Sequence, residues 1–543
     1  MQTDHHHEVI VIGAGVGGIY QIKCLVDQHI DAVLLEGDDD LGGTWYRNRY
    51  PGCRFDSESY TYGYSFSREL LDEWHWQERF SPQPENLKYL NFVADKFNLR
   101  QHMRFNTYVE ALAWDEDACL WHLTVRDGTN YTARYVVTSM GPLSAPTLPD
   151  IPGMDTFAGP AFHTYWWPKE GIDLAGKRVG IIGTGATGIQ VIGAIADQVG
   201  ELKVFQRRPN WSSPLNNSPI SAAEMEAIRA RYEEIFATCA STPSGFEHKP
   251  DRRGFWNLTA AERTAFWDEL YRSPGFAILA GNFTEIYVDE AANREISDYI
   301  ANRIRQRVDD PVTAEKLIPK DHGFGMQRLP LETNYFEAYN RPNVHLLDIT
   351  ESPIEAITAT GITTAAAHHE LDMIIYATGF DAITGAYDRL QITGVDGQRL
   401  ADKWQDGPQT YFGMMSHGFP NLFMIAGPQS ASGASNFPRA IEVNVNGVTS
   451  IIEQAVAQRW SRLEASAEAE QGWVDEVAGS YEKLLLRKGK GWFVGYNSNV
   501  KNGTTGKNRF PAYQGGGARF AKLFNAAMAD NLRGIDVRRE GVN

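Results

Sequence analysis

Two stretches of the chain share one pattern of hydrophobic and glycine positions. Residues 8–18 (EVIVIGAGVGG) and residues 178–190 (RVGIIGTGATGIQ) each join a short apolar run to a glycine-rich turn. Neither run alternates with polar residues, so each predicts a strand buried on both faces of a parallel sheet. A helix is predicted at residues 19–30, and a strand that ends at Glu36 follows it. The pattern therefore indicates two strand–turn–helix–strand units.

The first glycine turn has the spacing of a dinucleotide-binding loop. Gly13 allows the tight turn, Gly15 lets the backbone approach a pyrophosphate, and Gly18 lets helix and strand pack closely. The helix N-terminus adds unpaired N–H groups for the phosphates. Glu36 follows Gly18 by 18 residues, where a carboxylate can accept hydrogen bonds from a ribose and repels a 2′-phosphate. This unit is therefore predicted to bind FAD or NAD rather than NADP.

The second turn has the same glycines, Gly183, Gly185 and Gly188, but a different charge at the ribose position. Arg207 and Arg208 follow the next strand where the first unit has its acid. Arginine binds a 2′-phosphate through charge-assisted, bidentate hydrogen bonds, so this unit predicts NADPH. Two different dinucleotides in one chain indicate that hydride passes from nicotinamide to flavin. Because the chain has no C-x-x-C pair, the electron acceptors left open are dioxygen, a quinone or a protein partner.

The remaining pattern sets the domain organisation. From residue 221 the chain has helical periodicity without a nucleotide motif, which predicts an inserted helical subdomain, and a long amphipathic helix is expected at 443–462. We expect an α/β fold with two Rossmann-like dinucleotide-binding domains and this insertion. The predicted divisions are residues 1–145 for the first FAD part, 146–220 with 333–385 for the NADP domain, 221–332 for the insertion, and 386–543 for the second FAD part with a C-terminal lid loop.

Composition and charge exclude several other classes of function. The 543 residues are 43% hydrophobic and 22% charged, which is typical of globular chains, and the net charge of −17 argues against nucleic-acid or anionic-membrane binding. No metal site is expected, and His5, His6 and His7 are interpreted as a frayed terminal arm. No apolar run approaches the roughly 20 residues that span a bilayer. We expect a cytoplasmic protein that is a monomer or a weak homo-oligomer.

Two longer motifs identify a family resemblance. Residues 157–168 fit F-x-G-x-x-x-H-x-x-x-W-P, and residues 42–56 (GGTWYRNRYPGCRFD) fit G-G-x-W-x-x-x-x-Y-P-G-x-x-x-D. With these motifs the chain resembles the type I Baeyer–Villiger monooxygenases, and the resemblance covers nearly its whole length. The fingerprint residues are Phe157, Gly159, His163, Trp167 and Pro168.

The resemblance implies FAD, NADPH, dioxygen and a small-molecule ketone. Ketones would be oxidised to esters or lactones through a flavin C4a-peroxide, with sulfoxidation as a side activity. An N- or S-oxygenating flavin monooxygenase is the nearest alternative, and a non-catalytic flavin-binding module is a different class. The resemblance also gives His163 a structural role in the linker before the NADP domain, where it would hold a conformation or respond to the state of the cofactor.

The resemblance assigns the reacting centre to two charged residues. The segment GFGMQRLPLE (323–332) places the active-site arginine at Arg328, and the end of the longer motif places its carboxylate partner at Asp56. A permanently protonated arginine can stabilise an anionic peroxide and an anionic adduct without giving up a proton. Gln327 stands where many relatives have a lysine that holds the 2′-phosphate, and Arg208 is interpreted as compensating for it.

Further site residues follow from the same motifs. Trp492 matches a mobile loop that closes over the nicotinamide ribose, and its glycine-rich surroundings suit a lid. Beside Asp56, the residues expected to contact FAD are Gly43, Thr44, Trp45 and Tyr62. Thr184 and Gln190 are expected to approach NADPH. The expected substrate-lining residues are Ser432, Gly433, Ala434 and Phe437.

Overall fold

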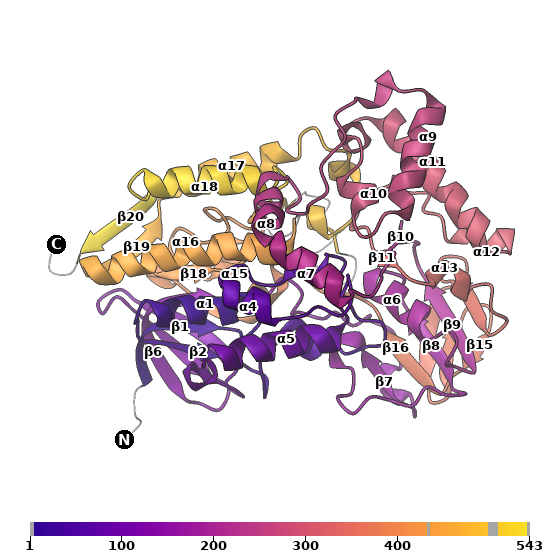
Figure 1. Ribbon diagram of the computed structural model, residues 1–543. Helices are drawn as coiled ribbons and strands as arrows, with labels where there is room; N and C mark the ends of the chain where they lie inside the picture. The colour runs from indigo at the N-terminus through magenta and orange to yellow at the C-terminus, as the bar shows by residue number, and fades with distance from the viewer. Residues whose placement is uncertain (1–4, 432–434, 498–508, 540–543) are drawn as a thin grey trace.

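Two sheets, each containing one of the glycine turns, lie side by side in the lower half of the computed structural model (Figure 1). The structure describes residues 5–431, 435–497 and 509–539. A helical insertion rises above the second sheet, and the C-terminal helices α17 and α18 cover the top of the first part of the molecule. In these described ranges no helix is long and apolar enough to cross a membrane.

The first sheet is built around β1, the strand that enters the first glycine turn. Strand β1 pairs in parallel with β2 and β6, and its last four residues are buried. The strand order is β17-β4-β5-β6-β1-β2-β3, and β18 pairs with β6. The strands are β1 His5–Ile12, β2 Ala32–Leu35, β3 Met103–Arg104, β4 Val109–Asp115, β5 Leu120–Val125, β6 Asn130–Thr138, β17 Gln391–Thr393 and β18 Leu422–Met424.

The interpretation of the three N-terminal histidines as a frayed arm is wrong. His5, His6 and His7 belong to β1 and lie opposite Tyr131, Thr132 and Ala133 of β6. The His5 ring stacks on Tyr131, and the His6 ring bonds the Thr132 hydroxyl. Cross-strand partners therefore extend the strand beyond its apolar core.

The second sheet is entirely parallel and has the order β12-β9-β8-β16-β7. Together with the first sheet and the helices that join the strands, it confirms the predicted α/β class. Its strands are β7 Ala161–His163, β8 Arg178–Ile182, β9 Glu201–Gln206, β12 Val344–Asp348 and β16 Met373–Tyr376. A small antiparallel sheet beside it contains β13 Ile354–Thr358, β14 Gly361–Thr364 and β15 His368–Glu370.

The helical insertion leaves and rejoins the second unit at one point. Strand β10 (Ser213–Pro214) pairs with β11 (Leu331–Glu332), so the two ends of the insertion lie together (Figure 1). Arg307 bonds the buried Glu332 at 2.6 Å and ties the insertion to this base. The helices between the two strands are α7 Ala222–Ala230, α8 Tyr232–Ser241, α9 Ala260–Arg272, α10 Ala277–Ala280, α11 Glu290–Arg307 and α12 Pro311–Lys316.

The C-terminal part is organised by one long helix, α16, which packs along α1. It runs from Phe437 to Gln458, not from 443 to 462 as predicted, because Arg459 takes a left-handed backbone conformation and Trp460 begins a strand. The other elements of this part are β19 Trp460–Ala465, α17 Ala467–Ser480, α18 Gly517–Ala529 and β20 Ile535–Arg539. The remaining helices include α1 Val16–Asp27, α2 Thr44–Arg47, α3 Ser59–Tyr62, α4 Arg68–Glu73, α5 Gln83–Lys96, α6 Ala186–Ile195, α13 Tyr335–Ala338, α14 Gly385–Arg389 and α15 Leu400–Lys403.

Candidate active site

The first glycine turn leaves room only for backbone. A Cβ at Gly13, whose φ is +103°, would lie 2.6 Å from the Ser139 carbonyl oxygen, and one at Gly18 would lie 1.8 Å from the Gly13 oxygen. Gly43 closes the other side, because a Cβ there would lie 2.8 Å from the Gly15 Cα. Helix α1 begins at this point without a side-chain cap, so its first N–H groups face the turn. The arrangement fits the diphosphate of a dinucleotide.

Glu36 is held at the end of β2 by backbone donors. The Ala14 N–H donates to its Oε2 at 2.7 Å, and the Asp38 N–H donates to its Oε1 at 2.9 Å. Burial raises the pKa of this carboxyl, while the Ala14 hydrogen bond and the Arg47 charge act to lower it. The carboxylate is therefore fixed beside the glycine turn, where a ribose of FAD would need an acceptor.

Aromatic side chains continue the first unit toward the centre of the molecule. Trp45 Nε1 donates to the Tyr62 hydroxyl at 2.8 Å, and Phe55 stacks on Tyr62 with ring centroids 4.2 Å apart. Thr44 starts α2 next to Trp45, and its hydroxyl accepts from Asn48 Nδ2. Thr44 and Trp45 thus precede Asp56 in the chain and Tyr62 follows it, and the Trp45–Tyr62 hydrogen bond joins the two sides; their contact with FAD stays a prediction.

The second glycine turn repeats the tight packing but is open at its middle glycine. A Cβ at Gly183 would lie 2.5 Å from the Ala377 oxygen, and one at Gly188 would lie 2.2 Å from the Gly183 oxygen. A Cβ at Gly185 would meet nothing within 4 Å, and α6 begins there without a side-chain cap. This space at a helix N-terminus fits the diphosphate of a second dinucleotide. The Thr184 hydroxyl donates to the Arg208 carbonyl oxygen at 3.0 Å, which fixes the arginine pair relative to the turn.

The side chains of Arg207 and Arg208 line a cavity of about 300 Å³. Asp321, Lys490 and Tyr496 are the other described residues of its lining. Partial burial and the Arg208 charge lower the pKa of Arg207. The sequence patterns did not single out Lys490 or Tyr496 for this place, because both come from the segment around Trp492.

Arg328 and Asp56 form an ion pair at the base of the insertion. Arg328 Nη2 lies 2.9 Å from Asp56 Oδ2, and the guanidinium carbon lies 5.2 Å above the centre of the Phe276 ring. Asn210 Nδ2 donates to the Arg328 carbonyl oxygen at 3.1 Å. Arg328 therefore contacts the end of the 42–56 motif through Asp56. It also contacts the segment after Arg207 and Arg208, through Asn210. Phe276 is a contact that no sequence motif indicated.

The two partners of this pair differ in exposure. The Asp56 side chain is 6% exposed and the Arg328 side chain is 38% exposed. Burial raises the pKa of Asp56, and the Arg328 charge and hydrogen bond act to lower it. A buried carboxylate thus holds a guanidinium whose other face remains accessible. This arrangement leaves the cation available to an anionic group in the adjoining space.

The fingerprint segment contains a buried, neutral histidine that is bonded within the second unit. His163 is fully buried, its Nδ1 accepts from the Tyr165 N–H at 3.1 Å, and its Nε2 therefore donates to the Gly379 oxygen at 3.0 Å. Burial lowers the pKa of His163 to about 4, against the effect of the Gly379 hydrogen bond. Gly159 is needed because a Cβ there would lie 2.6 Å from the Asp372 oxygen.

The rest of the fingerprint packs on both sides of the linker. Phe162 meets the buried Trp167 edge to face at 5.0 Å, directly before Pro168, while Phe157 packs against the core of the second unit. Lys169 Nζ reaches Asp39 of the first unit at 2.7 Å, and Arg47 lies over the Tyr165 ring. The linker therefore contacts both units.

Other predicted site residues are placed as follows. The Gln190 amide is engaged between the two units, since Tyr50 OH donates to its Oε1 at 3.0 Å and its Nε2 donates to the Arg54 oxygen at 2.9 Å. Its contact with NADPH stays a prediction. Trp492 stacks on Phe493 in a short turn, and Phe437 begins α16. Ser432, Gly433 and Ala434 lie outside the described residues.

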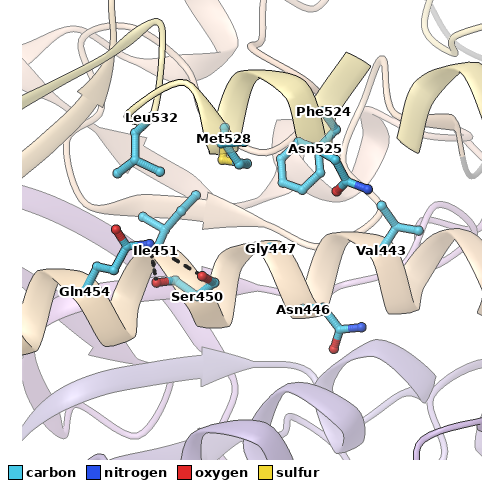
Figure 2. Close-up of a pocket in the computed structure, with 11 residues that line it drawn as sticks. Val443, Asn446, Gly447, Ser450, Ile451, Gln454, Phe524, Asn525, Met528 and Leu532 are labelled. Carbon is cyan, nitrogen blue, oxygen red and sulfur yellow. Dashed lines mark hydrogen bonds between the residues drawn. The ribbon is translucent and has the colours of Figure 1, made fainter. Parts of the chain in front are cut away.

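A larger cavity of about 460 Å³ lies elsewhere, between α16 and α18 (Figure 2). Val443, Ile451, Phe524 and Met528 are among its apolar lining, and none of its lining residues belongs to the predicted site. In the described ranges, no three His, Cys, Asp or Glu side chains gather in a way that could hold a metal ion. The candidate site is therefore the region between the two glycine turns and Arg328.

Comparison with known proteins gives this geometry a family context. Residues 6–213 match the model of the flavin-binding monooxygenase-like family. The chain is 43% identical over 536 residues to 2-oxo-Δ3-4,5,5-trimethylcyclopentenylacetyl-CoA monooxygenase of Pseudomonas putida, with 98% of each chain covered. It is 40% identical to acetone monooxygenase (methyl acetate-forming) of Gordonia sp. strain TY-5, covering 97% of this chain and 98% of the relative.

A solved structure extends the similarity to three dimensions. The crystal structure of OTEMO in complex with FAD and NADP superimposes with a TM-score of 0.94 at 43% identity, covering 99% of this chain and all of the other. FAD and NADP are thus bound by a protein with the same two glycine-turn units. The predicted fold class of two Rossmann-like units with a helical insertion is confirmed.

Proposed function

Because the chain belongs to the type I Baeyer–Villiger monooxygenases, we propose that it oxidises a ketone to an ester or lactone with NADPH and dioxygen. It is an FAD- and NADPH-dependent monooxygenase. The proposal rests on one observation above the others, the Arg328–Asp56 pair at the junction of the two units. A permanent cation there suits a reaction in which negative charge develops on oxygen.

The bound groups supply the redox chemistry. NADPH supplies the hydride, and FAD carries its electrons to dioxygen. The residues of the first turn, with Glu36 and the Trp45–Tyr62 pair, would hold FAD. Those of the second turn, with Arg207 and Arg208, would hold NADPH.

The chain itself supplies position and charge. Asp56 and Phe276 hold the Arg328 guanidinium, whose side chain stays 38% exposed and would stabilise negative charge on the reacting oxygen. Arginine stays protonated at all working pH values, so it can stabilise an oxyanion without donating a proton. Because its pKa is lowered to about 4, His163 is neutral near pH 7 and serves to position the linker.

The activity test uses the FAD-loaded protein with NADPH, dioxygen and a cyclic ketone. The expected product is the lactone, identified by its mass and by hydrolysis to a hydroxy acid. An added sulfide tests the proposed side activity through its sulfoxide. Sulfoxide or N-oxide without any lactone would favour the alternative N- or S-oxygenating function. If neither the ketone nor the sulfide increases the oxidation of NADPH, both the ketone-oxidising and the N- or S-oxygenating functions are contradicted.

Arg328→Ala tests the arginine directly. We expect the variant to accept electrons from NADPH at nearly the normal rate and to form about a hundred- to a thousandfold less ester, as when one preorganised donor is lost. Flavin reduction is followed by its absorbance and the ester by chromatography. Arg305→Ala is the control, since Arg305 pairs with Glu315 on the exposed face of the insertion. Near-normal ester formation by Arg328→Ala would contradict the assignment.

A further inference from the structure

The cavity beside the arginine pair is more positive than the molecule as a whole. Among the described residues of its lining, three are basic, Arg207, Arg208 and Lys490, and one is acidic, Asp321. The whole chain carries a net charge of −17, so this local excess of positive charge opposes the general balance. A concave site with an excess of cations attracts an anionic group.

Asp321 already has partners of its own. His322 Nδ1 bonds its Oδ1 at 2.6 Å, and Arg208 Nη1 lies 3.4 Å from its Oδ2. Burial acts to raise the pKa of Asp321, but the His322 hydrogen bond and the Arg208 charge leave it lowered. The carboxylate is therefore already engaged by His322 and Arg208, and an anion such as a phosphate monoester would meet the basic residues of the lining.

Lys490 reaches the cavity from a distant part of the sequence, on a segment fixed next to Arg328. Gln327 Nε2 donates to the Lys490 carbonyl oxygen at 3.1 Å. Gly489 allows close packing here, since a Cβ at this position would lie 3.2 Å from the Met326 oxygen.

The same segment then folds back on itself. The Tyr496 N–H donates to the Gly491 oxygen at 3.1 Å, which brings the Tyr496 side chain to the cavity as well. Trp492 lies between these two contacts, in a short turn. The segment that carries Trp492 therefore contributes two of the five residues of the cavity lining.

We propose that Lys490 is a third cationic ligand of the NADPH 2′-phosphate, beside Arg207 and Arg208. The inference rests on the proposed use of NADPH and adds a residue that selects it. A lysine ammonium is a point charge on a flexible stem, so it can join a phosphate that two arginines already contact. A coenzyme without the 2′-phosphate gains nothing from Lys490.

The test measures equilibrium binding, not turnover. NADP⁺ and NAD⁺ are titrated calorimetrically into the FAD-loaded protein, for the parent chain and for Lys490→Met, Lys490→Arg and Lys488→Met. Lys490→Met should weaken NADP⁺ binding about tenfold, as expected for one charge-assisted hydrogen bond, and leave NAD⁺ binding unchanged. The loss of NADP⁺ affinity caused by Lys490→Met should be smaller at high salt, because ions screen exposed charges.

The two other variants separate a specific ligand from a general charge effect. Lys490→Arg keeps the cation and should bind NADP⁺ within about twofold of the parent. Lys488 lies two residues earlier and pairs with Glu290, so Lys488→Met should not change the ratio of the two affinities. Equal weakening of NADP⁺ and NAD⁺ by Lys490→Met, or the same loss in Lys488→Met, would overturn the proposal. Because no oxygenation is measured, absence of ketone oxidation would leave these affinities interpretable.

Discussion

At the scale of single residues, burial sets the charge of two side chains in the family motifs. Burial raises the pKa of Asp56, but Arg328 at 2.9 Å opposes this and favours the carboxylate. His163 has no such partner, since it contacts the Gly379 oxygen and the Tyr165 N–H. Burial therefore raises the pKa of the acid against the effect of its arginine partner, and it lowers the pKa of the histidine to about 4, so the ring is neutral near pH 7.

The neutral state of His163 has a measurable effect on stability. Its folded pKa is about 4, whereas an unfolded histidine has a pKa near 6.5. As pH falls below about 6.5 the unfolded chain binds a proton that the folded chain does not, so the free energy of unfolding falls. Between pH 7 and pH 5 this residue should account for about 2 kcal/mol of that fall.

His163→Gln provides the comparison, since glutamine does not titrate. The free energy of unfolding is measured by denaturant titration at several pH values. Between pH 7 and pH 5 it should fall less for the variant than for the parent chain, whatever the stability of the variant at pH 7. Parallel curves for the two proteins would show that His163 is protonated in the folded state.

Motif residues were predictable from the sequence because backbone chemistry dictates them. Glycines at 13, 18 and 183 are required by contacts closer than 3 Å, and the Arg328–Asp56 partnership followed from two motifs. Phe276 and Lys490 were not predictable, because each lies far along the sequence from the residues it contacts or accompanies. No motif spacing shows that the fold brings them together. The acidic composition gave no sign of the local cationic cavity.

At the scale of elements, helix α16 shows where sequence periodicity is insufficient. Its apolar stripe indicated a helix, but the pattern continued into β19, whose buried residues pair with β20. The end of the helix is fixed by the left-handed Arg459. The start at Phe437 was also missed, because Pro438 would break a helix interior and is tolerated here only because it lies in the first turn.

Packing of α18 on α16 depends on Gly447. A Cβ there would lie 2.3 Å from Phe524 Cζ (Figure 2). Alanine in a helix normally gains about 1 kcal/mol over glycine, but overpacking of this contact costs about 1–3 kcal/mol. Gly447→Ala should therefore lower the free energy of unfolding, measured by denaturant titration.

The control for this prediction lies in the neighbouring helix α17. A Cβ at Gly472 would meet nothing within 4 Å, so Gly472→Ala should stabilise the protein by up to about 1 kcal/mol. Adding Phe524→Leu to Gly447→Ala should restore part of the loss, since it removes the ring atoms in the way. A Gly447→Ala protein as stable as Gly472→Ala would mean that the two helices separate without cost.

At the scale of the whole molecule, the helical insertion is joined to the first unit by a buried ion pair. His248 Nε2 lies 2.8 Å from Glu58 Oε1, and Glu58 follows Asp56 by two residues. Gly275 allows the insertion to approach closely, since a Cβ there would lie 2.9 Å from the same carboxylate oxygen. The next residue, Phe276, supports the Arg328 guanidinium. The pair therefore anchors the side of the insertion that positions the arginine.

The stability that the His248–Glu58 pair contributes should change with pH in the opposite direction to the contribution of His163. Burial acts to lower the pKa of His248, but its hydrogen bond to Glu58 and the charges of Glu58 and Glu247 leave it raised. A base with a raised folded pKa contributes stability that is complete below its unfolded pKa and is lost as pH rises through the folded value. Replacing His248 by Gln should lower the free energy of unfolding by about 2 kcal/mol near pH 6 and by clearly less near pH 9.

The measurement compares thermal midpoints of the parent chain and His248→Gln across that pH range. His345→Gln is the matched control, because His345 lies 3.4 Å from Glu201 in a pair that is 46% and 30% exposed, and such surface pairs contribute little. If the insertion is anchored as described, the thermal midpoint of His248→Gln should approach that of the parent chain as pH rises. The difference in midpoint between His345→Gln and the parent chain should not change. When the His248–Glu58 pair weakens at high pH, Arg328 should be held less firmly. Above neutral pH, the rate of ester formation by the parent chain should therefore fall more steeply than the rate of flavin reduction by NADPH. A constant midpoint difference would mean that His248 acts by packing alone and that its charge does not hold the insertion in place.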